Sequence, residues 1–466
     1  MAGAAGARNP GRRPSAHDRG ELEDPGVSDM PERPREIFVV GLEPHQRRVL
    51  ERLPRAGELR FHALLPADRL RGVQHLPMDT LYRDAQETLE AWQGPVDGII
   101  TLLDFPAPEI AALLIRERGL PGPGLEAVMR CNHKYWSRLL QQDAVPEAVP
   151  AFAPFDPFDE DAAAALEGHP GYPLWVKPLN AYRSLLGFRV EDRAGLERAL
   201  NALRDGIARL ADPFSWFLPR TELPREIATL PAHTCIAESI LAGHQCTLEG
   251  YVQDGTPHAY AVIDSIRDPN GVSFARYQYP STLPASVQAR MAELAERAVQ
   301  ATGLQHSPFN VEFFYDAERD RIGLLEINPR LSQSHCEILE MVNGVSHQQI
   351  AVDLALGRTP QVPEREGPWP CAAKLFIRAF RDGCVRRVPD SERIREIERR
   401  LPGVSIQLQV AAGERLSELA DQDSYSFELA CVWIGAEDTR QLLARFEQCR
   451  DWLGIEIDSD GQERVR

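Results

Sequence analysis

The chain has 466 residues, 43% of them hydrophobic and 26% charged, which is the composition of a soluble globular protein with roughly two to four domains. Its net charge of −17 argues against a general nucleic-acid-binding surface, and no apolar run approaches the roughly 18 residues that cross a bilayer. The eight cysteines include no CxxC pair, so we expect reduced thiols in a cytoplasmic protein.

The first part of the chain predicts a tail followed by a small α/β unit. Residues 1–35 carry arginines with no following apolar segment, so we expect a disordered tail. Strands alternate with helices over residues 36–124, which predicts a parallel sheet that ends at the breaker cluster GLPGPG. The strands are expected at 37–41, 59–65 and 96–103, and the helices at 45–53 and 81–92.

Two further units are predicted, over 125–363 and 371–466, separated by the proline-rich join QVPEREGPWP. In the second unit we expect helices near 128–142 and 285–302, strands at 174–177, 310–315 and 322–328, and an amphipathic segment at 336–357. In the third, strands at 373–380, 405–410 and 425–434 alternate with helices, which indicates an α+β unit.

The run LLEINPRL (324–331) places an acid, an amide and a guanidinium at the end of an apolar strand, although burying such groups unpaired is costly. If 317–321 is a turn, Glu312 lies directly opposite Glu326, and Asn328 shares the face of Glu326. Like charges opposite each other destabilise a sheet, whereas Mg2+ binds carboxylate and amide oxygens. We therefore predict that these three residues hold Mg2+ (or Mn2+), with Arg330 beyond them to meet an anion. The alternative is an edge hairpin with solvated acids.

The segment VEFFYDAERDRIGLLEINPRL (311–331) resembles the metal-binding segment of the ATP-grasp superfamily, which includes biotin carboxylases, carbamoyl-phosphate synthetases and many carboxylate–amine ligases. The resemblance extends over most of residues 36–466. It implies an N-terminal parallel α/β pre-ATP-grasp domain, a central ATP-grasp fold and a small C-terminal α+β domain. It also implies that Glu312, Glu326 and Asn328 hold metal ions bridging the phosphates of ATP, and that Arg330 contacts the transferred phosphoryl group or an acyl phosphate.

Further segments resemble the nucleotide-binding parts of this family. NHKYWSRLL (132–140) and YPLWVKP (172–178) match segments with phosphate-binding lysines, here Lys134 and Lys177, which give an acidic protein the local positive charge that ATP requires. The loop LNAYRSLLGF (179–188) corresponds to a usually glycine-rich phosphate loop. Here it keeps only Gly187, and we predict that Ser184 and the backbone N–H groups contact phosphate.

CIAESILAGHQCTLEGYVQDG (235–255) resembles the strand that binds adenine, with Glu238 at its start and Ile240 packing on the purine. Gln245 stands where family members often have a glutamate near the ribose, and its amide can accept from ribose hydroxyls. Glu249 has two interpretations, a contact with the acceptor substrate or a structural role. Residues 332–335 are predicted to shape an acceptor or carboxylate pocket, and His335 is equally well explained as a buried imidazole. Polar residues near the C-terminus are predicted on the substrate side, namely Asp421, Gln422, Asp423 and Tyr425.

The resemblance implies that ATP activates a carboxylate as an acyl phosphate, which an amine then attacks, without a Ser or Cys nucleophile. In NPRLSQSH (328–335), biotin carboxylases have a glutamate before the histidine as the base for bicarbonate; Ser334 cannot take that proton. We therefore predict a ligase for small-molecule carboxylates and amines, often amino acids. We expect no nucleic-acid or membrane partner, and a homodimer is left open. Biotin carboxylase-like carboxylation and a non-catalytic ATP-binding module are the alternatives.

Overall fold

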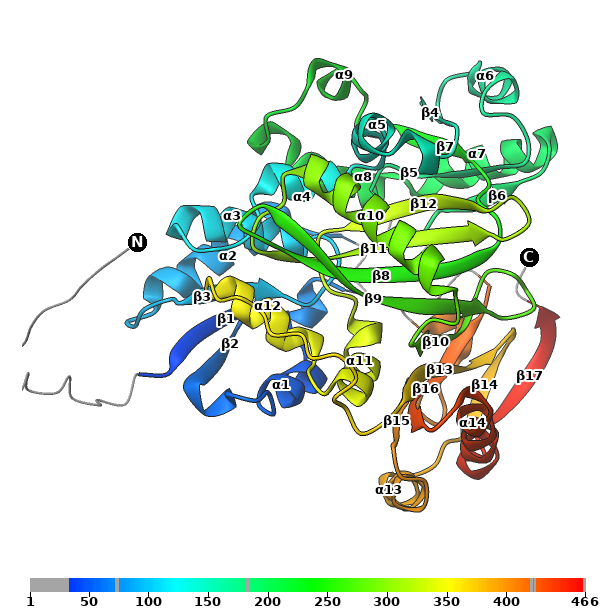
Figure 1. Ribbon diagram of the computed structural model, residues 1–466. Helices are drawn as coiled ribbons and strands as arrows, with labels where there is room; N and C mark the ends of the chain where they lie inside the picture. Colours follow the sequence, from blue (N-terminus) through cyan, green and yellow to red (C-terminus); the bar gives the residue numbers. More distant parts are fainter. Residues whose placement is uncertain (1–32, 72–74, 181–184, 420–421, 423–424, 464–466) are drawn as a thin grey trace, which may run out of the picture. The chain divides into compact units, whose positions relative to one another are not determined.

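The computed structural model describes residues 33–71, 75–180, 185–419, 422 and 425–463 (Figure 1). Its first part contains a three-stranded parallel sheet in the order β2–β1–β3, which confirms the predicted parallel α/β arrangement. The elements are β1 (Arg35–Leu42), α1 (Pro44–Leu50), η1 (Ala56–Glu58), β2 (Leu59–Pro66), η2 (Ala67–Arg69), α2 (Met78–Ala91), β3 (Gly98–Thr101) and α3 (Ala107–Arg118).

An antiparallel four-stranded sheet in the order β4–β7–β5–β6 follows. The helix expected near 128–142 is two helices, because the chain turns at His133, whose Nδ1 accepts from Trp136 N at 3.1 Å and caps the second helix. The elements are α4 (Leu125–Asn132), α5 (Lys134–Ala144), η3 (Pro146–Ala148), β4 (Phe152–Phe155), α6 (Ala162–Gly168), β5 (Leu174–Pro178), β6 (Phe188–Val190), α7 (Arg193–Gly206), α8 (Ala208–Ser215), η4 (Leu218–Arg220), α9 (Arg225–Ala228) and β7 (Cys235–Ser239).

The largest sheet has eight strands in the order β12–β11–β8–β9–β10–β13–β16–β15. Its first half is packed against α10, which ends at Gly303, where a φ of +74° suits glycine. The elements of this part are β8 (His244–Gln253), β9 (Thr256–Arg267), β10 (Phe274–Tyr279), α10 (Ala285–Thr302), β11 (Ser307–Asp316), β12 (Arg321–Asn328), η5 (Gln333–His335), α11 (Cys336–Asn343) and α12 (His347–Ala355).

The C-terminal part adds strands to the same sheet, because β13 pairs with β10 across the join at 361–370. The mixture of helices and strands predicted there is confirmed, while the division at 36–124, 125–363 and 371–466 stays a prediction. The elements are β13 (Cys371–Ala379), β14 (Arg381–Arg387), α13 (Ser391–Arg400), β15 (Val404–Leu408), η6 (Leu416–Glu418), β16 (Phe427–Ala436), α14 (Thr439–Leu453) and β17 (Glu456–Glu463).

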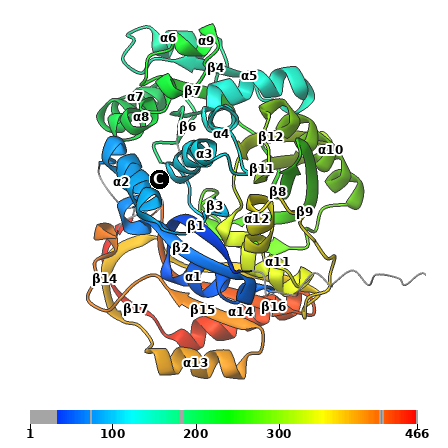
Figure 2. The ribbon, with the colours of Figure 1, turned by 90° about the vertical axis from the view of Figure 1, so that its left-hand side faces the viewer.

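Strand β1 is buried on both faces, which explains its continuous apolar sequence. Phe38 and Val40 point to one side, into a core shared with residues of α2 and α3. Ile37 and Val39 point to the other side, where they share a core with Val352 of α12. Figures 1 and 2 both show α12 beside this sheet, so a helix from much later in the chain closes the N-terminal sheet.

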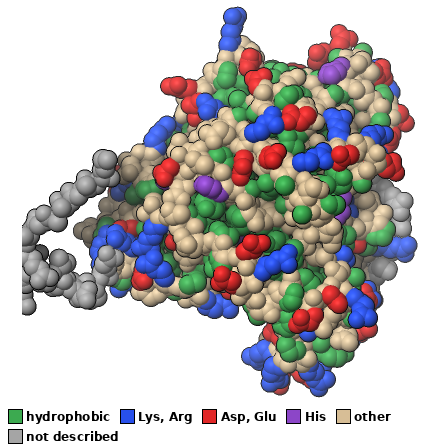
Figure 3. Space-filling view, in the orientation of Figure 1, with side chains coloured by type: hydrophobic (Ala, Val, Ile, Leu, Met, Phe, Trp, Pro, Cys, Tyr) green, Lys and Arg blue, Asp and Glu red, His purple; other side chains and the backbone are tan. Residues whose placement is uncertain are grey.

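On the face shown in Figure 3, basic and acidic side chains lie interspersed over most of the surface. Within the described residues, no helix combines the length and the apolar composition that crossing a membrane requires.

Candidate active site

A cavity of about 1470 Å³ opens between the N-terminal, central and C-terminal strands. It exceeds the roughly 300–1,000 Å³ of a common ligand pocket, so it has room for a nucleotide and further substrates. The structure brings nine of the predicted site residues together on its wall: Lys134, Lys177, Glu238, Ile240, Gln245, Glu312, Glu326, Asn328 and Arg330. Ser184, Asp421 and Asp423 lie outside the described residues, whereas Gln422 and Tyr425 line the cavity.

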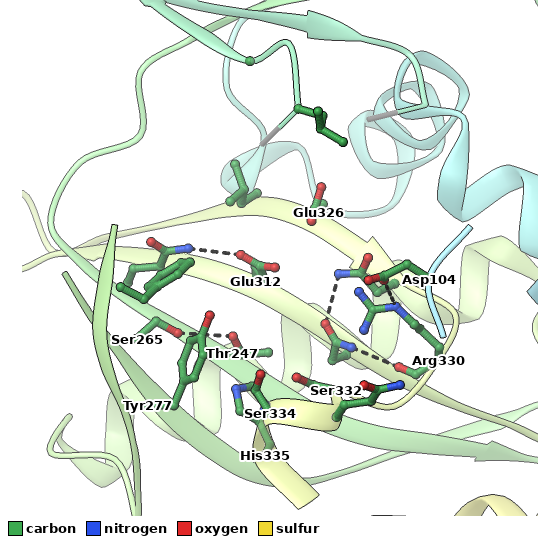
Figure 4. A pocket seen from close by; sticks show the side chains of 18 of the residues that line it. Asp104, Thr247, Ser265, Tyr277, Glu312, Glu326, Arg330, Ser332, Ser334 and His335 are labelled. Atoms are coloured by element: carbon green, nitrogen blue, oxygen red, sulfur yellow. Dashed lines mark hydrogen bonds and ion pairs between the residues drawn. The ribbon is translucent and has the colours of Figure 1, made fainter. Parts of the chain in front are cut away.

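The hairpin of β11 and β12 places Glu312 directly opposite Glu326, as predicted (Figure 4). The route to this register differs from the prediction. The turn is one residue shorter than expected, because Asp316 already pairs with Arg321. A bulge that leaves Leu325 unpaired then shifts the register back by one residue. The two carboxylates therefore face each other because of the bulge.

Asn328 lies on the same face of β12 as Glu326 and is held by its cross-strand neighbour. Its Nδ2 donates to Asn310 Oδ1 at 3.0 Å, and Asn310 Nδ2 donates to the backbone oxygen of Arg330 at 3.0 Å. Among the described residues, Asn328 Oδ1 has no hydrogen-bond partner, so this oxygen is oriented and available as a ligand.

The two facing glutamates have opposite electrostatic environments. Burial and the charge of Glu326 raise the pKa of Glu312, which accepts a hydrogen bond from Gln245 Nε2 at 3.0 Å. Burial alone would raise the pKa of Glu326 too, but Lys134 and Lys177 outweigh it and lower that pKa. Lys134 Nζ lies 3.0 Å from Glu326 Oε2. The described residues hold no cluster of three or more His, Cys, Asp or Glu side chains suited to a metal, so a cation here needs amide and phosphate oxygens as well.

Lys177 is fixed by a buried network that includes Glu238. Lys177 Nζ lies 2.7 Å from Glu238 Oε2, and Arg138 Nε donates to Glu238 Oε1 at 2.6 Å. Burial opposes ionisation of Glu238, but the charges of Arg138 and Lys177 outweigh burial and lower its pKa to about 2. Burial lowers the pKa of Lys177. Lys177 and Glu238 both stay charged because the attraction between them offsets the cost of burying each charge.

Sequence reasoning missed Arg138, which links this network to β12. Arg138 is 2% exposed and donates to the backbone oxygens of Leu324, at 2.9 Å, and Leu325, at 2.6 Å. These carbonyls belong to the bulged residue and to the residue before it, so Arg138 supports the register of Glu326. The available signal was its position four residues after Lys134 in NHKYWSRLL, which places both side chains on one face of α5.

Two residues predicted to contact the adenosine part of ATP, Glu238 and Gln245, are hydrogen-bonded or ion-paired to other protein side chains. Both oxygens of Glu238 are engaged by cations. Gln245 Oε1, the expected acceptor for the ribose, takes a hydrogen bond from Arg267 Nε at 2.8 Å. Ile240 lines the cavity next to Glu238. Roles for these residues toward adenine and ribose stay predictions.

Arg330 lies at the end of the hairpin and forms an ion pair with Asp104, which follows β3 (Figure 4). Its Nη1 donates to the backbone oxygen of Leu331 at 3.1 Å. Asp104 was not among the predicted site residues, although an acid in the loop after a strand of a parallel sheet stands where such sheets bind ligands. The pair orients the guanidinium, which lines the cavity.

Glu249 and His335 form a buried pair beside Arg330. His335 Nδ1 and Glu249 Oε1 are 2.5 Å apart, and both side chains are nearly inaccessible to solvent. Burial raises the pKa of Glu249 to about 7 and lowers the pKa of His335 to about 3, which keeps the imidazole neutral. His335 lines the cavity with Ser332, Gln333 and Ser334. His335 therefore fits both interpretations offered by the sequence: its imidazole is buried, and it also lines the cavity.

Cys131, which lines the cavity, and Cys336, which is buried and follows His335 in the chain, are thiols at neutral pH. Burial raises the pKa of Cys131 to about 12 and the pKa of Cys336 well above its usual value. Since the thiolate is the nucleophile, neither sulfur is suited to covalent catalysis.

This arrangement of a carboxylate hairpin, two lysines and an arginine around one cavity is the one that the resemblance to ATP-grasp proteins predicts. Residues 170–337 match the family model described as an ATP-grasp domain. This part of the chain is thus an ATP-grasp domain, in agreement with the family suggested by the hairpin sequence.

Two similar proteins are much longer than this chain. Over 121 residues the chain is 36% identical to carnosine synthase 1 of Gallus gallus, covering 24% of this chain and 13% of that protein. Over 135 residues it is 31% identical to the carbamoyl phosphate synthase large chain of Thermotoga sp. (strain RQ2), covering 28% of this chain and 12% of that protein. The chain thus spans about one eighth of the length of these relatives.

Solved structures resemble the fold over nearly the whole chain. An L-amino acid ligase from Bacillus licheniformis superposes with a TM-score of 0.70 and 17% identity, covering 92% of this chain and 100% of that one. A biotin carboxylase from Campylobacter jejuni superposes with a TM-score of 0.63 and 15% identity, covering 91% and 92%. These likenesses establish the fold.

Proposed function

We propose that the protein is an ATP- and Mg2+-dependent ligase that activates a carboxylate as an acyl phosphate and joins it to an amine. The observation that carries this proposal is the convergence of the Glu312–Glu326 pair, Lys134, Lys177 and Arg330 on one cavity. The names of the similar proteins, carnosine synthase 1 and L-amino acid ligase, support a ligase that forms a C–N bond.

The hairpin fits a hard divalent cation. Glu312, Glu326 and Asn328 would hold Mg2+ (or Mn2+), because two facing carboxylates and an oriented amide oxygen supply the oxygen ligands that such ions prefer. When bound, the metal neutralises charge on the phosphate oxygens. The raised pKa of Glu312 fits this assignment, since it reflects burial and a facing negative charge that a cation would offset.

The protein's own cations would position the substrates. Lys134 and Lys177 stand beside Glu326 and supply charge for the phosphates of ATP. The guanidinium of Arg330, oriented by Asp104, would bind the oxygens of the acyl phosphate in a bidentate manner. The amine nitrogen then forms the C–N bond as the C–O bond to phosphate breaks. Phosphate leaves with the electron pair, and the amine proton passes to water or phosphate.

A cytoplasmic location belongs to the same proposal. All eight cysteines are free thiols, as expected for a protein in a reducing compartment. Small-molecule carboxylates and amines are the proposed substrates, in agreement with the volume of the cavity.

The function is tested by screening ADP release against pools of amino acids and small carboxylic acids, with hydroxylamine present. We expect one pool to stimulate ADP release and to yield a hydroxamate, which identifies the activated acid. ATP binding without turnover in any pool would favour a non-catalytic ATP-binding module. ADP release that requires bicarbonate and biotin would favour a carboxylase.

A further inference from the structure

The chain contains three lysines among its 52 lysines and arginines, and all three line the cavity. Lys134 is paired with Glu326 at 3.0 Å and Lys177 with Glu238 at 2.7 Å. Lys374, on β13, has no carboxylate partner among the described residues. The other basic side chains of the protein are arginines. Lysine, whose ammonium group is compact and has three donors, therefore occurs only at the cavity.

Lys374 is held in place by neutral groups. It pairs across the sheet with Tyr277 of β10 and with Trp433 of β16, so three side chains stand in a row on one face. Its Nζ lies 5.1 Å from the ring centres of both Phe376 and Trp433, and it donates to Ser334 Oγ at 3.2 Å. The rings exclude water and attract the cation, but they do not neutralise its charge.

A half-buried ammonium without a counter-ion is costly unless a ligand supplies the anion. The charge of Lys374 is felt at His335, whose pKa is lowered first by burial and then by Lys374. The neighbouring arginine on the same strand, Arg378, does not share this property, since it pairs with Glu428. Lys374 is therefore a cation on this wall that is suited to bind an anionic group of a ligand.

The position of Lys374 indicates which anion it binds. The cations that act on the metal-binding Glu326 are Lys134, Lys177 and Arg330, which serve the phosphates and the activated carboxylate. Lys374 instead contacts Ser334, on the segment beyond Arg330. An anion at Lys374 thus belongs to a substrate other than the acid being phosphorylated.

We propose that Lys374 binds the carboxylate of the amine substrate, so that this substrate is an amino acid or short peptide rather than ammonia or a simple amine. This inference rests on the proposed ligase function. Lys374 and the row formed with Tyr277 and Trp433 would hold the carboxylate and leave the amino group near Ser334 and His335.

The test compares L-amino acids with the matching L-amino acid amides as acceptors, using the acid found in the hydroxamate screen as donor. Lys374→Met should lower kcat/KM for amino acids about 30-fold, the scale of a lost partly buried charge pair, and change the values for amides by about twofold at most. Hydroxamate formation should stay unchanged, because hydroxylamine carries no carboxylate. Lys374→Arg should restore part of the preference for acids.

The control is Arg386→Met, which removes one positive charge from a side chain that is 65% exposed on β14. Equal use of amino acids and amides by the wild-type protein would overturn the inference. An equally strong loss of hydroxamate formation in Lys374→Met would also overturn it, by assigning the lysine to the donor or to phosphate. If the wild-type protein forms no hydroxamate with any acid, the ligase function itself fails, and the inference fails with it.

Discussion

Glu312 and Glu326 stand opposite each other on β11 and β12, yet their partners differ in charge. Lys134 Nζ lies 3.0 Å from Glu326, whereas Glu312 accepts from the neutral amide of Gln245 at 3.0 Å. One carboxylate is therefore kept ionised by a lysine, and the other carries a raised pKa because of burial and the facing charge. A cation bound at the hairpin, as proposed above, would offset the negative charge that Glu312 faces.

The first prediction follows directly. ATP should stabilise the protein only with Mg2+ or Mn2+, because the two carboxylates repel the triphosphate in the absence of a cation. At about a hundredfold excess over Kd the stabilisation amounts to about 2.7 kcal/mol, which a thermal-shift assay detects. EDTA should abolish the shift. The same shift with and without metal would contradict the assignment of the hairpin.

Glu326→Gln should reduce substrate-dependent ADP release by about 10²-fold or more, while ATP affinity changes by less than about tenfold. The reason is that a metal-neutralised phosphate gains several kcal/mol in the transition state. The matched control is Glu318→Gln, in the exposed turn of the same hairpin. Steady-state kinetics and ATP titration would separate the two effects, and an unchanged rate of ADP release would remove Glu326 from the metal site.

Arg330→Lys should slow ligation by about 10²-fold, because it keeps the charge but loses the fork that binds two oxygens. Asp104→Asn keeps the guanidinium and removes its ion-pair partner, so we expect a smaller loss in the same direction. Single-turnover measurement of product formation tests both variants. A wild-type rate in Arg330→Lys would show that the arginine contributes charge alone.

Glu238→Gln should destabilise the fold by about 3–5 kcal/mol, because Arg138 and Lys177 remain buried with a partner that no longer carries charge. The folded-state pKa of Glu238 is lowered from 4.5 to about 2, so its ionised form stabilises the protein above about pH 4.5. This contribution is lost as the pH falls from about 4.5 towards 2. Urea unfolding of both proteins should therefore differ most near neutral pH and converge in acid. A constant difference across this range would exclude the ion pair as its cause.

Much of the hairpin was predictable because it depends on local rules. Side chains in a strand alternate with a period of two, so the spacing of Glu326 and Asn328 placed them on one face. The pairing of Glu312 with Glu326 was also predicted, although the shorter turn and the bulge at Leu325 compensate each other in a way that the sequence did not reveal. Two register shifts that cancel within one hairpin leave no trace in a hydrophobic pattern.

The α/β class, the parallel N-terminal sheet and the hairpin that carries the proposed metal ligands were predictable from the sequence, because they follow from periodicity and from residue types at short spacing. Which charged side chains pair with one another can be seen only in the tertiary structure. Arg138 contacts Glu238 and the bulge carbonyls, and Asp104 contacts Arg330, across separations that no local period encodes. Likewise, all three lysines are visible in the sequence, but only the packing of β13 between β10 and β16 shows that Lys374 has no carboxylate partner within the part of the chain that the structure describes. Charge compensation is a property of distance in space, and folding sets that distance.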